Sequence, residues 1–501
     1  MGKSHDIKDE IRIKSIDGDE LFGSENADLE HESLFDSYSL DRDDFSKLYD
    51  TKRKIAILFS YKGSGKSAAL RLIRNRHKDS VDSVVALMSA GEITPTTQSN
   101  DVAAWTSAWK QSILKQLAAE VGTRISSAYD DDATTLVQYA EREGFKRVNF
   151  VGYVTKHLSE KYQLTKQADL DSGVSKKIQR FLNSKQILVW LLIDDVDSNF
   201  KADPNAKAKI VGFISAIKLL TSQIPELRTR FTIRPNVWEL LAKDFDSINQ
   251  MREFQIPIEW VEKDIMQLLA KRISSYYHRS ESNMAGSLDE DGDHREWIGL
   301  VFEDQMRWSG STRPPHVVLD TLSRNRPRWL IELAKLSLKS AKTNGHLRIT
   351  LDDVNERLEE FGRARITDSI AEFGSQCSQL EQLISCFREQ EKTYRQDQLI
   401  SLINNNILTH INPQIVGVPT KPDAKDIIRF LYFIGFLSAR KDRENGSYEH
   451  IPYADNPTFL ATVFDVRNSF TWEIHPVFAV ALQMRSERPI SGLGAKGSNR
   501  R

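Results

Sequence analysis

Short apolar runs and longer amphipathic stretches alternate along the first half of the chain. Apolar runs of about four to eight residues are typical of buried parallel strands, and apolar positions at helical spacing are typical of helices. The segments that read as strands are Lys54–Phe59, Val84–Met88, Ile187–Ile193, Arg228–Ile233 and Phe254–Ile258. Helical spacing fits Ala68–Arg76, Trp105–Val121 and Lys207–Ser222. This alternation predicts an α/β core with a parallel sheet.

From about Trp260 the pattern becomes helical, and a third block begins near Arg365. The expected helices of the middle block are Val261–Ser275, Glu296–Met306, Pro315–Ser323, Trp329–Thr343 and Leu351–Phe361. The third block reads as helices Cys377–Phe387, Tyr394–Ile403 and Asp426–Phe433, then strands Phe436–Arg440 and Tyr448–Tyr453 around an Asn445-Gly446 turn. Helices followed by a β-wing resemble a winged helix. The polar residues 1–20 are expected to be mobile.

A phosphate-binding motif lies between the first predicted strand and the helix after it. It reads Ser60-Tyr61-Lys62-Gly63-Ser64-Gly65-Lys66-Ser67, a P-loop with Ser60 in place of the usual first glycine. Gly63 and Gly65 let backbone N–H groups curve around phosphate oxygens, and the helix N-terminus adds partial positive charge. Lys66 is expected to reach the β- and γ-phosphates, and the Ser67 hydroxyl to ligate Mg²⁺.

Acidic residues follow the most apolar strand, Ile187–Ile193. Asp194 fits the carboxylate that holds Mg²⁺ through water, and Asp195 fits the residue that polarises the attacking water. Asp197 is a supporting residue or a helix cap. The alternative is an acidic turn after a core strand, but the P-loop some 120 residues earlier favours the functional interpretation.

Two arginines near strand ends are candidates for contact with the γ-phosphate. Arg234 ends the fourth predicted strand, and Arg252 lies just before the fifth, where many ring-forming ATPases place an arginine finger for a neighbouring subunit. Arg228 and Arg230 compete for the finger role. The alternative for Arg234 and Arg252 is an ordinary surface arginine.

Arg328 is a third candidate, in the helical block. It belongs to Arg326-Pro327-Arg328-Trp329, which opens a predicted helix. From there Arg328 could close over a nucleotide. The alternative is packing at the helix N-terminus around Trp329.

These motifs together resemble AAA+/STAND-type P-loop ATPases, in the bacterial branch near the KAP ATPases and the origin-recognition-type AAA+ proteins. The resemblance rests on Tyr61–Ala68, Asp194–Asp197, Arg234 and Arg326–Trp329, and spans roughly residues 20–345. It implies ATP and Mg²⁺ as cofactors, a homo-oligomer, and a helical lid followed by a winged helix. Many relatives act in bacterial defence against phage, where the ATPase senses or assembles and a partner effector protein does the damage.

The expected organisation combines the pattern with the resemblance. It is a P-loop NTPase core with a parallel sheet, followed by an α-helical lid and a C-terminal winged-helix-like domain. The boundaries are an acidic segment 1–50, the core 51–260 with a polar helical insert at 122–180, the lid 261–364, the winged-helix-like domain 365–484 and a disordered tail 485–501.

The chain has 69 basic and 70 acidic residues, but the charge is unevenly distributed between the N-terminal segment and the rest. Residues 1–50 hold 15 acids and 6 bases, so the remaining 451 residues carry 63 bases and 55 acids. A nucleic-acid partner therefore stays open. Basic residues that could contact DNA phosphates in the winged-helix-like block are Lys421, Lys425, Arg429, Arg440, Lys441 and Arg443. The alternative is a winged helix used for packing or protein contacts.

The two cysteines, Cys377 and Cys386, argue for a reducing compartment rather than a disulfide framework. No apolar run approaches the ~20 residues of a membrane helix, and the N-terminus has no signal-type apolar region. We therefore expect a cytoplasmic protein with no membrane partner. We find no zinc, hydrolase-elbow or nuclease motif, so nucleotide binding and turnover are the only chemistry the sequence predicts.

Three functional hypotheses follow. The first is an ATP-hydrolysing switch, sensor or assembly motor for a partner effector, with anti-phage defence as the expected setting. The second is a DNA-binding regulator or loader controlled by ATP. The third is a scaffold that holds ATP without hydrolysing it.

Overall fold

A computed structural model gives the fold, and its chain divides into two compact units. One unit contains Ile16–Val301 and Arg324–Glu332, and the other contains Phe302–Ser323 and Leu333–Arg501 together with Ile11–Ser15. The residues that the structure describes are 13–124, 137, 176, 178–183, 186–280, 293–308, 311–418, 421–442, 448–453 and 470–485. Most of the predicted insert, the Asn445-Gly446 turn, Arg443 and the tail after Arg485 lie outside them.

The first unit is built on a five-stranded sheet in the order β2-β3-β4-β1-β5. The strands are β1 (Ile55–Phe59), β2 (Ser83–Ser89), β3 (Leu188–Asp194), β4 (Leu227–Ile233) and β5 (Gln255–Pro257). All neighbouring strands run parallel. The predicted parallel α/β core is therefore confirmed, with each strand within about two residues of its expected bounds. Because β4 lies between β1 and β3, the carboxyl ends of these three strands meet along one edge.

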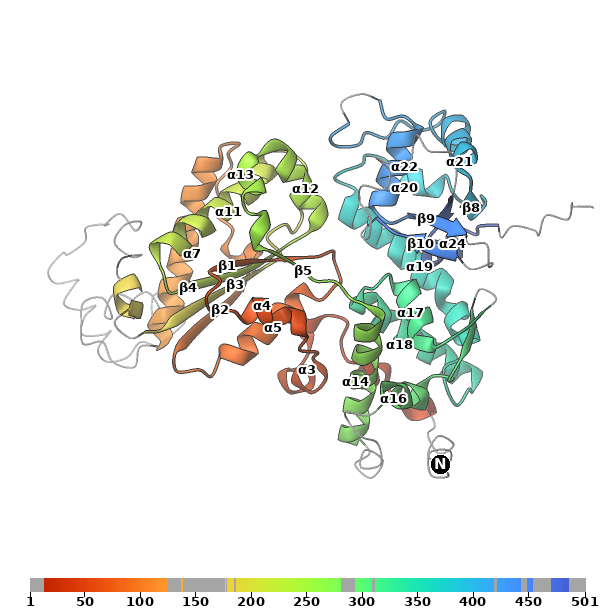
Figure 1. Cartoon of the computed structure of the whole chain (residues 1–501), viewed down its shortest axis with the longest axis horizontal. Helices are drawn as coiled ribbons and strands as arrows, with labels where there is room; N and C mark the ends of the chain where they lie inside the picture. Colours follow the sequence, from red (N-terminus) through yellow and green to blue (C-terminus); the bar gives the residue numbers. More distant parts are fainter. Residues whose placement is uncertain are drawn as a thin grey trace, which may run out of the picture. The chain divides into compact units, whose positions relative to one another are not determined.

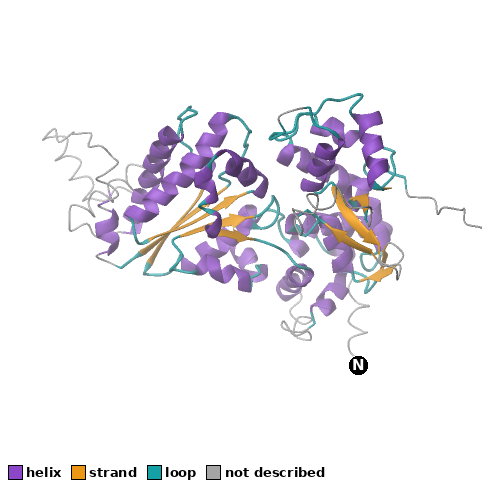
Figure 2. Ribbon diagram, turned by 45° about the horizontal axis from the view of Figure 1, so that its top comes forward, coloured by secondary structure: helices purple, strands orange, loops and turns teal. Residues whose placement is uncertain are grey.

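Helices cover both faces of this sheet (Figure 1; Figure 2). The helices on one face are α4 (Ser46–Tyr49) and α5 (Lys66–His77), and those on the other are α7 (Val102–Arg124) and α11 (Pro204–Gln223). Phe213 of α11 makes edge-to-face contacts with Trp109 and Phe231, at ring-centroid distances of 5.1 and 5.2 Å. These aromatic contacts pack α11 against α7 and against β4 of the sheet.

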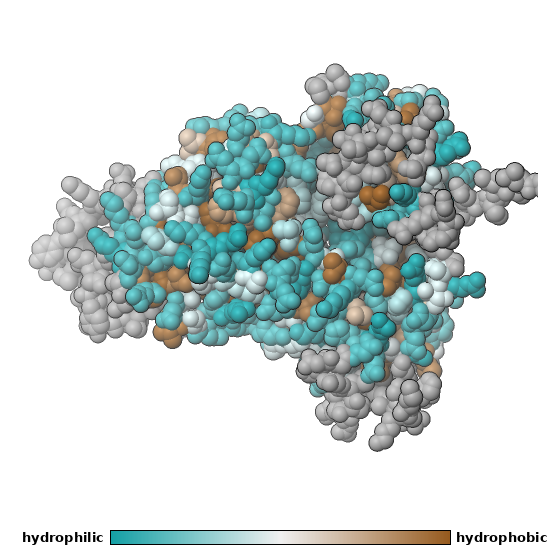
Figure 3. Space-filling model, in the orientation of Figure 1, coloured by the Kyte–Doolittle hydropathy of each residue, from teal (hydrophilic) through white to brown (hydrophobic). Residues whose placement is uncertain are grey.

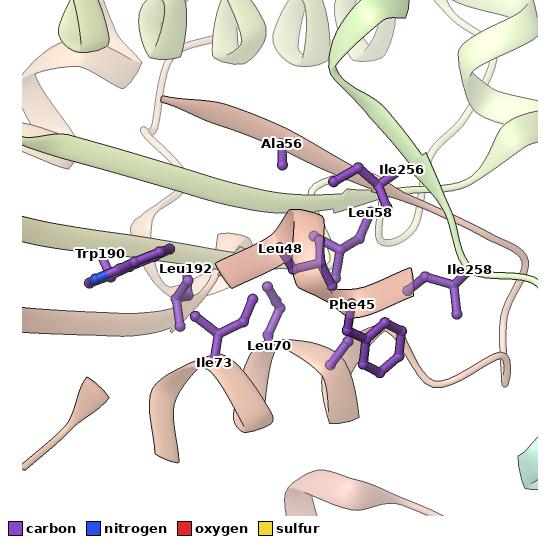
Figure 4. Packing of buried hydrophobic residues seen from close by; sticks show 11 residues of the cluster. Phe45, Leu48, Ala56, Leu58, Leu70, Ile73, Trp190, Leu192, Ile256 and Ile258 are labelled. Atoms are coloured by element: carbon purple, nitrogen blue, oxygen red, sulfur yellow. The ribbon is translucent and has the colours of Figure 1, made fainter. Parts of the chain in front are cut away.

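The core beneath the phosphate-binding motif is a cluster of buried aliphatic and aromatic side chains. Leu48, Leu58, Leu70, Ile73 and Leu192 point toward one another between the sheet and α5 (Figure 4). All five are fully buried. This packing fixes α5 against β1 and β3, so the helix N-terminus has a defined position at the strand ends.

The expectation that residues 1–20 are mobile is wrong for Ile13–Glu20. The short helices of the N-terminal region are η1 (Ile13–Ser15), α2 (Gly18–Phe22), η2 (Ala27–Leu29), α3 (Glu32–Tyr38) and η3 (Asp43–Phe45). The side chains of Ile16, Leu21, Phe22 and Phe35 are buried. Apolar residues at these few positions are enough to hold an otherwise acidic segment against the protein.

The helical region after Trp260 forms largely as expected. The helices after Trp260 are α14 (Glu262–Ser280), α16 (His294–Val301), α17 (Pro315–Ser323), α18 (Pro327–Asn344) and α19 (Leu351–Phe373). Between β4 and β5 the chain forms α12 (Pro235–Asp244), α13 (Asp246–Asn249) and η4 (Arg252–Phe254). The predicted helix Glu296–Met306 is too long. The chain leaves α16 after Val301 because Phe302 bridges Ile349 and the Glu303 N–H donates to the Ile349 carbonyl at 3.0 Å.

A hairpin and a second sheet complete the second unit. The hairpin strands are β6 (Met306–Trp308) and β7 (Ser311–Arg313), which the sequence did not predict. The four-stranded antiparallel sheet has the order β10-β9-β11-β8, formed by β8 (Thr393–Tyr394), β9 (Leu437–Asp442), β10 (Tyr448–Ile451) and β11 (Thr471–Ile474). The accompanying helices are α20 (Leu380–Ser385), α21 (Gln396–Leu402), η5 (Ile403–Ile407), α22 (Ala424–Phe433) and α24 (Pro476–Ala479).

Helix α19 is continuous across residue 365, where the third block was expected to begin. Its N-terminus has a capping box between Thr350 and Asp353. Within the second unit α19 approaches α24 closely, since a Cβ at Gly362 would lie 2.5 Å from the Val477 carbonyl oxygen. Only glycine allows that approach.

Hydrophobic atoms on the surface view lie in small groups among hydrophilic ones (Figure 3). Large apolar side chains are therefore mainly interior. Among the described residues, none of the helices combines the length and apolar character needed to cross a membrane.

Candidate nucleotide site

The P-loop turns sharply between β1 and α5, as its glycines require. Gly63 and Gly65 have φ angles of 83° and 89°, a region in which side chains with a Cβ are strained. Gly65 is the N-cap of α5 and supplies no side-chain cap to the helix. The first turn of this 12-residue helix therefore presents N–H groups and a partial positive charge toward the loop. The arrangement suits a phosphate group.

Lys66 lies inside the loop, with only 8% of its surface exposed. Its Nζ donates to the carbonyl oxygens of Ser60, at 2.9 Å, and Tyr61, at 3.0 Å. The Ser60 hydroxyl in turn donates to the Ile258 carbonyl at 3.1 Å. A buried ammonium held by loop carbonyls can exchange these weak partners for phosphate oxygens, which form stronger charge-assisted hydrogen bonds.

Trp260 supports the loop from outside, which the sequence reasoning missed. Its Nε1 donates to the Ser64 carbonyl at 2.8 Å. The Arg42 guanidinium lies 4.7 Å from the Trp260 ring centroid, and the Asn325 side chain donates to the Trp260 carbonyl at 2.9 Å. The only sequence signal was a tryptophan three residues after β5, the last strand of the sheet.

Asp194 and Asp195 lie at the end of β3 beside Thr232 of β4. The Thr232 hydroxyl donates to Asp194 Oδ1 at 2.6 Å, and the Asp195 N–H donates to the same oxygen at 2.8 Å. The Asp195 N–H also reaches Thr232 Oγ1 at 2.9 Å. These bonds fix the Asp194 carboxylate. Thr232, which the sequence reasoning did not select, is therefore a positioning residue.

Asp195 adopts a left-handed backbone, with φ of 53°. Aspartate tolerates this region better than most residues, yet such strain costs on the order of 1–3 kcal/mol and is frequent at functional sites. The turn directs the Asp195 side chain into the pocket that Lys66 and Ser67 also line. Of the two predicted carboxylates, Asp194 is thus fixed at the strand end and Asp195 faces the pocket.

The environment of Asp195 disfavours the ionised form of its carboxylate at neutral pH. Desolvation raises its pKa, and the nearby carboxylates of Asp194, Asp197 and Asp28 add to this rise, while Lys66 opposes it. A bound cation would relieve this repulsion.

The residues present fit Mg²⁺ bound together with phosphate. The Ser67 hydroxyl in the pocket and the Asp194 carboxylate at the end of β3 are hard oxygen atoms of the kind that Mg²⁺ prefers. No cluster of three or more acidic, histidine or cysteine ligands occurs among the described residues. Mg²⁺ usually takes one or two protein oxygens and completes its shell with water and substrate phosphates.

Arg234 is turned away from the pocket toward Asp197. Its Nε lies 2.7 Å from Asp197 Oδ2, its backbone N–H donates to the same oxygen at 2.9 Å, and its Nη2 donates to the Asp197 carbonyl. Asp197 is 2% exposed. Asp197 thus anchors Arg234 at the strand end, and the Arg234 side chain does not line the pocket.

The competing finger candidates differ in accessibility. Arg230 is fully buried and donates to the carbonyls of Leu48, Asp50 and Arg53, so it is a structural residue. Arg228 is bound to backbone carbonyls at the start of the same strand. Arg252 is exposed in η4, before β5, and lies outside the pocket of its own chain.

Arg328 lies at the pocket, and its neighbour Arg326 accounts for the packing around Trp329. The Arg328 N–H donates to the Gly63 carbonyl at 3.2 Å, which ties the start of α18 to the P-loop. The Arg326 guanidinium lies 4.4 Å from the Trp329 ring and 5.5 Å from the Tyr61 ring. Arg328 therefore lies at the pocket, as the nucleotide-contact hypothesis requires, and Arg326 provides the packing against Trp329.

Some of the predicted site residues line the pocket and others do not. The predicted residues that line it are Lys62, Gly63, Gly65, Lys66, Ser67, Asp195 and Arg328. Ser60, Tyr61, Ser64, Asp194, Arg234 and Arg252 are not among its lining residues. The lining residues that the sequence reasoning missed are Glu25, Asn26, Ala27, Asp28, Phe35, Ala68, Arg272, Pro327 and Ile331. Ala68 and Pro327 are sequence neighbours of the predicted Ser67 and Arg328. The others reach the pocket through tertiary packing, for which the local sequence carries no signal.

Comparison with known proteins adds limited information. No family model and no curated protein matches the chain. Among solved structures, the Aeropyrum pernix ORC2 protein in ADPNP-ADP complexes is similar over 90% of this chain and 92% of that chain, at 11% identity and a TM-score of 0.37. Cdc6p from Pyrobaculum aerophilum is similar over 90% and 96%, at 12% identity and a TM-score of 0.31. Drosophila ORC bound to DNA is similar over 91% and 93%, at 9% identity and a TM-score of 0.28. These TM-scores are too low to support an argument about fold or function.

Replacing Asp195 by asparagine should stabilise the nucleotide-free protein. A carboxyl whose folded-state pKa is raised costs stability once pH exceeds its unfolded value. The asparagine side chain removes that cost and still tolerates the left-handed backbone. We expect the melting temperature at pH 7.5 to rise by on the order of 1–2 °C, and the difference from wild type to shrink toward pH 4. Differential scanning calorimetry checks this. A variant that melts lower than wild type at every pH contradicts the electrostatic account.

Proposed function

We propose that this protein binds and hydrolyses ATP with Mg²⁺ and acts as a nucleotide-controlled switch or assembly motor. The observation that supports it is the convergence of Lys66, Ser67, Asp195 and Arg328 on one pocket at the carboxyl edge of a parallel sheet. Ligands of open α/β sheets bind at that edge. ATP rather than GTP follows from the sequence resemblance alone.

Each residue has a role that its position supports. The P-loop N–H groups and Lys66 hold the β- and γ-phosphates. Ser67 and Asp194 would hold Mg²⁺, which would supply positive charge beside the phosphates. Asp195 orients the attacking water and accepts its proton. Arg328 binds the γ-phosphate, so its backbone bond to Gly63 links the start of α18 to the nucleotide state.

The assembly and the other domains are part of the proposal. We propose that a lid begins at 261 and that a winged-helix-like domain follows it, with β9 and β10 as the wing. The predicted bounds are 261–364 and 365–484, but α19 is continuous from Leu351 to Phe373, so we place the boundary after this helix. A homo-oligomer would let the exposed Arg252 act on a neighbouring subunit's nucleotide, and Arg234 would sense the γ-phosphate only after leaving Asp197. The partner effector and the setting in anti-phage defence rest on the sequence resemblance, as does the expected cytoplasmic location.

Lys66→Ala should abolish tight binding of ATP with Mg²⁺, weakening it by about 100-fold, because it removes the only buried ammonium that lines the described pocket. Lys52→Ala, at an exposed position just before β1, is the matched control and should bind as wild type. Isothermal titration calorimetry measures both. Unchanged affinity in the Lys66 variant would sink the site assignment.

Asp195→Asn should bind ATP at least as tightly as wild type does and lose turnover by about 100-fold or more, since it removes a negative charge and the proton acceptor but leaves the phosphate-binding groups in place. Single-turnover phosphate release after mixing with excess enzyme is the measurement. Wild-type turnover in the variant would remove Asp195 from this role. Wild-type protein that binds ATP and releases no phosphate would instead support the non-hydrolysing scaffold.

DNA binding is the weaker alternative. The exposed position of Lys441 on β9 favours DNA binding. Neighbouring charges are neutralised, however: Glu473 lies 3.5 Å from Arg440, and Asp426 lies 3.6 Å from Arg429. A salt-dependent gel shift with duplex DNA that disappears on charge reversal at Arg440, Lys441 and Arg443 would favour this alternative over a protein partner.

A further inference from the structure

An N-terminal strap, which we define as Gly23–Asp28, borders the pocket through its residues Glu25–Asp28. Arg272 of α14 donates to the carbonyls of Phe22 and Ser24, the latter at 3.2 Å. Gly23 has φ of 67°, and a Cβ there would lie 2.9 Å from Arg272 Nη1. The strap therefore begins at a turn whose positive φ favours glycine, held by the partly buried Arg272.

The other end of the strap is held by the P-loop helix itself. Arg71 of α5 donates to the Ala27 carbonyl, and its guanidinium lies 4.4 Å from the Phe35 ring. Further along, Glu32 pairs with Lys78 and, at 3.4 Å, with Arg74 of the same helix. The strap and the phosphate-binding helix are thus one connected structure, and Asp28 follows directly from the anchored Ala27.

Asp28 brings a negative charge to the pocket proposed to hold the nucleotide phosphates. It lines the pocket with Lys66, Ser67, Asp195 and Arg328. Desolvation and the Asp194 carboxylate raise the Asp28 pKa, while Arg71 and Arg328 lower it. The Asp28 carboxylate therefore lies within electrostatic reach both of the carboxylate assigned to Mg²⁺ and of the arginine assigned to the γ-phosphate.

We propose that Asp28 is a specificity-determining residue that weakens nucleoside triphosphate binding relative to diphosphate. This inference rests on the proposed nucleotide site. A γ-phosphate must share Arg328 with Asp28 and approach the Asp28 carboxylate, whereas a diphosphate ends short of both. At an effective dielectric of about 20, charges several ångströms apart interact strongly enough for roughly a tenfold effect on affinity.

The nucleotide site would therefore bind a nucleoside diphosphate in preference to a triphosphate when the strap is in this position. Triphosphate binding then requires either Mg²⁺ to screen the repulsion or displacement of the strap from its two arginine anchors. Asp28 and its strap would couple the identity of the nucleotide to the conformation of the N-terminal segment.

The experiment compares the affinities of ADP and a non-hydrolysable triphosphate, AMP-PNP, by calorimetry on the full chain, with Mg²⁺ and with EDTA. We expect Asp28→Asn to tighten AMP-PNP binding about tenfold and to change ADP binding by less than about twofold, most clearly in EDTA. Asp28→Glu, which keeps the charge, should restore the wild-type ratio. Asp36→Asn, the same charge change outside the pocket where Asp36 accepts from Asn75 at 2.6 Å, is the matched control.

An unchanged ratio of the two affinities in Asp28→Asn overturns the inference while leaving the nucleotide site intact. Equal changes in both affinities also overturn it, because they indicate that Asp28 only positions the strap. Wild-type protein that binds neither nucleotide overturns the proposed function itself. Thermal melting confirms that the variants fold, and Asp28→Ala replaces Asp28→Asn if the latter does not.

Discussion

The site depends on the pairing of β4 between β1 and β3. That order places the P-loop, Thr232 and Asp194 at neighbouring strand ends, so one hydroxyl can hold the carboxylate of the next strand at 2.6 Å. The core between the sheet and α5 then fixes the helix N-terminus against these groups. In this sheet order the Asp194 carboxylate is held beside the P-loop strand through Thr232 of the strand between them.

The acidic N-terminal segment takes on a defined role in this arrangement. Its carboxylates lie along the basic helix α5: Glu32 near Arg74 and Lys78, and Asp41 3.5 Å from Arg76. Individually such exposed pairs contribute little stability. Together with buried apolar side chains they hold the segment in the region that borders the pocket. The charge asymmetry of the sequence thus reflects an intramolecular counter-charge as much as any nucleic-acid surface.

The sequence was informative where chemistry is local. The strands and the P-loop could be predicted because period, glycine spacing and flanking elements are encoded in a few consecutive residues. Thr232, Trp260 and Asp28 could not, because each reaches the site by pairing or packing between segments far apart in the chain. Arg234 shows the converse: its position at a strand end suggested the pocket, while the structure pairs it with Asp197.

The central claim is that nucleotide binds between the P-loop, the end of β3 and the strap. Hydrogen–deuterium exchange with and without ATP and Mg²⁺ tests it most directly, because it locates the bound ligand along the chain. The account predicts slower exchange in peptides that cover Ser60–Ala68, Asp194–Asp197 and Gly23–Asp28, with no change in α22 and β9. Exchange that stays unchanged at the P-loop while nucleotide is bound, or protection confined to the second unit, would contradict it.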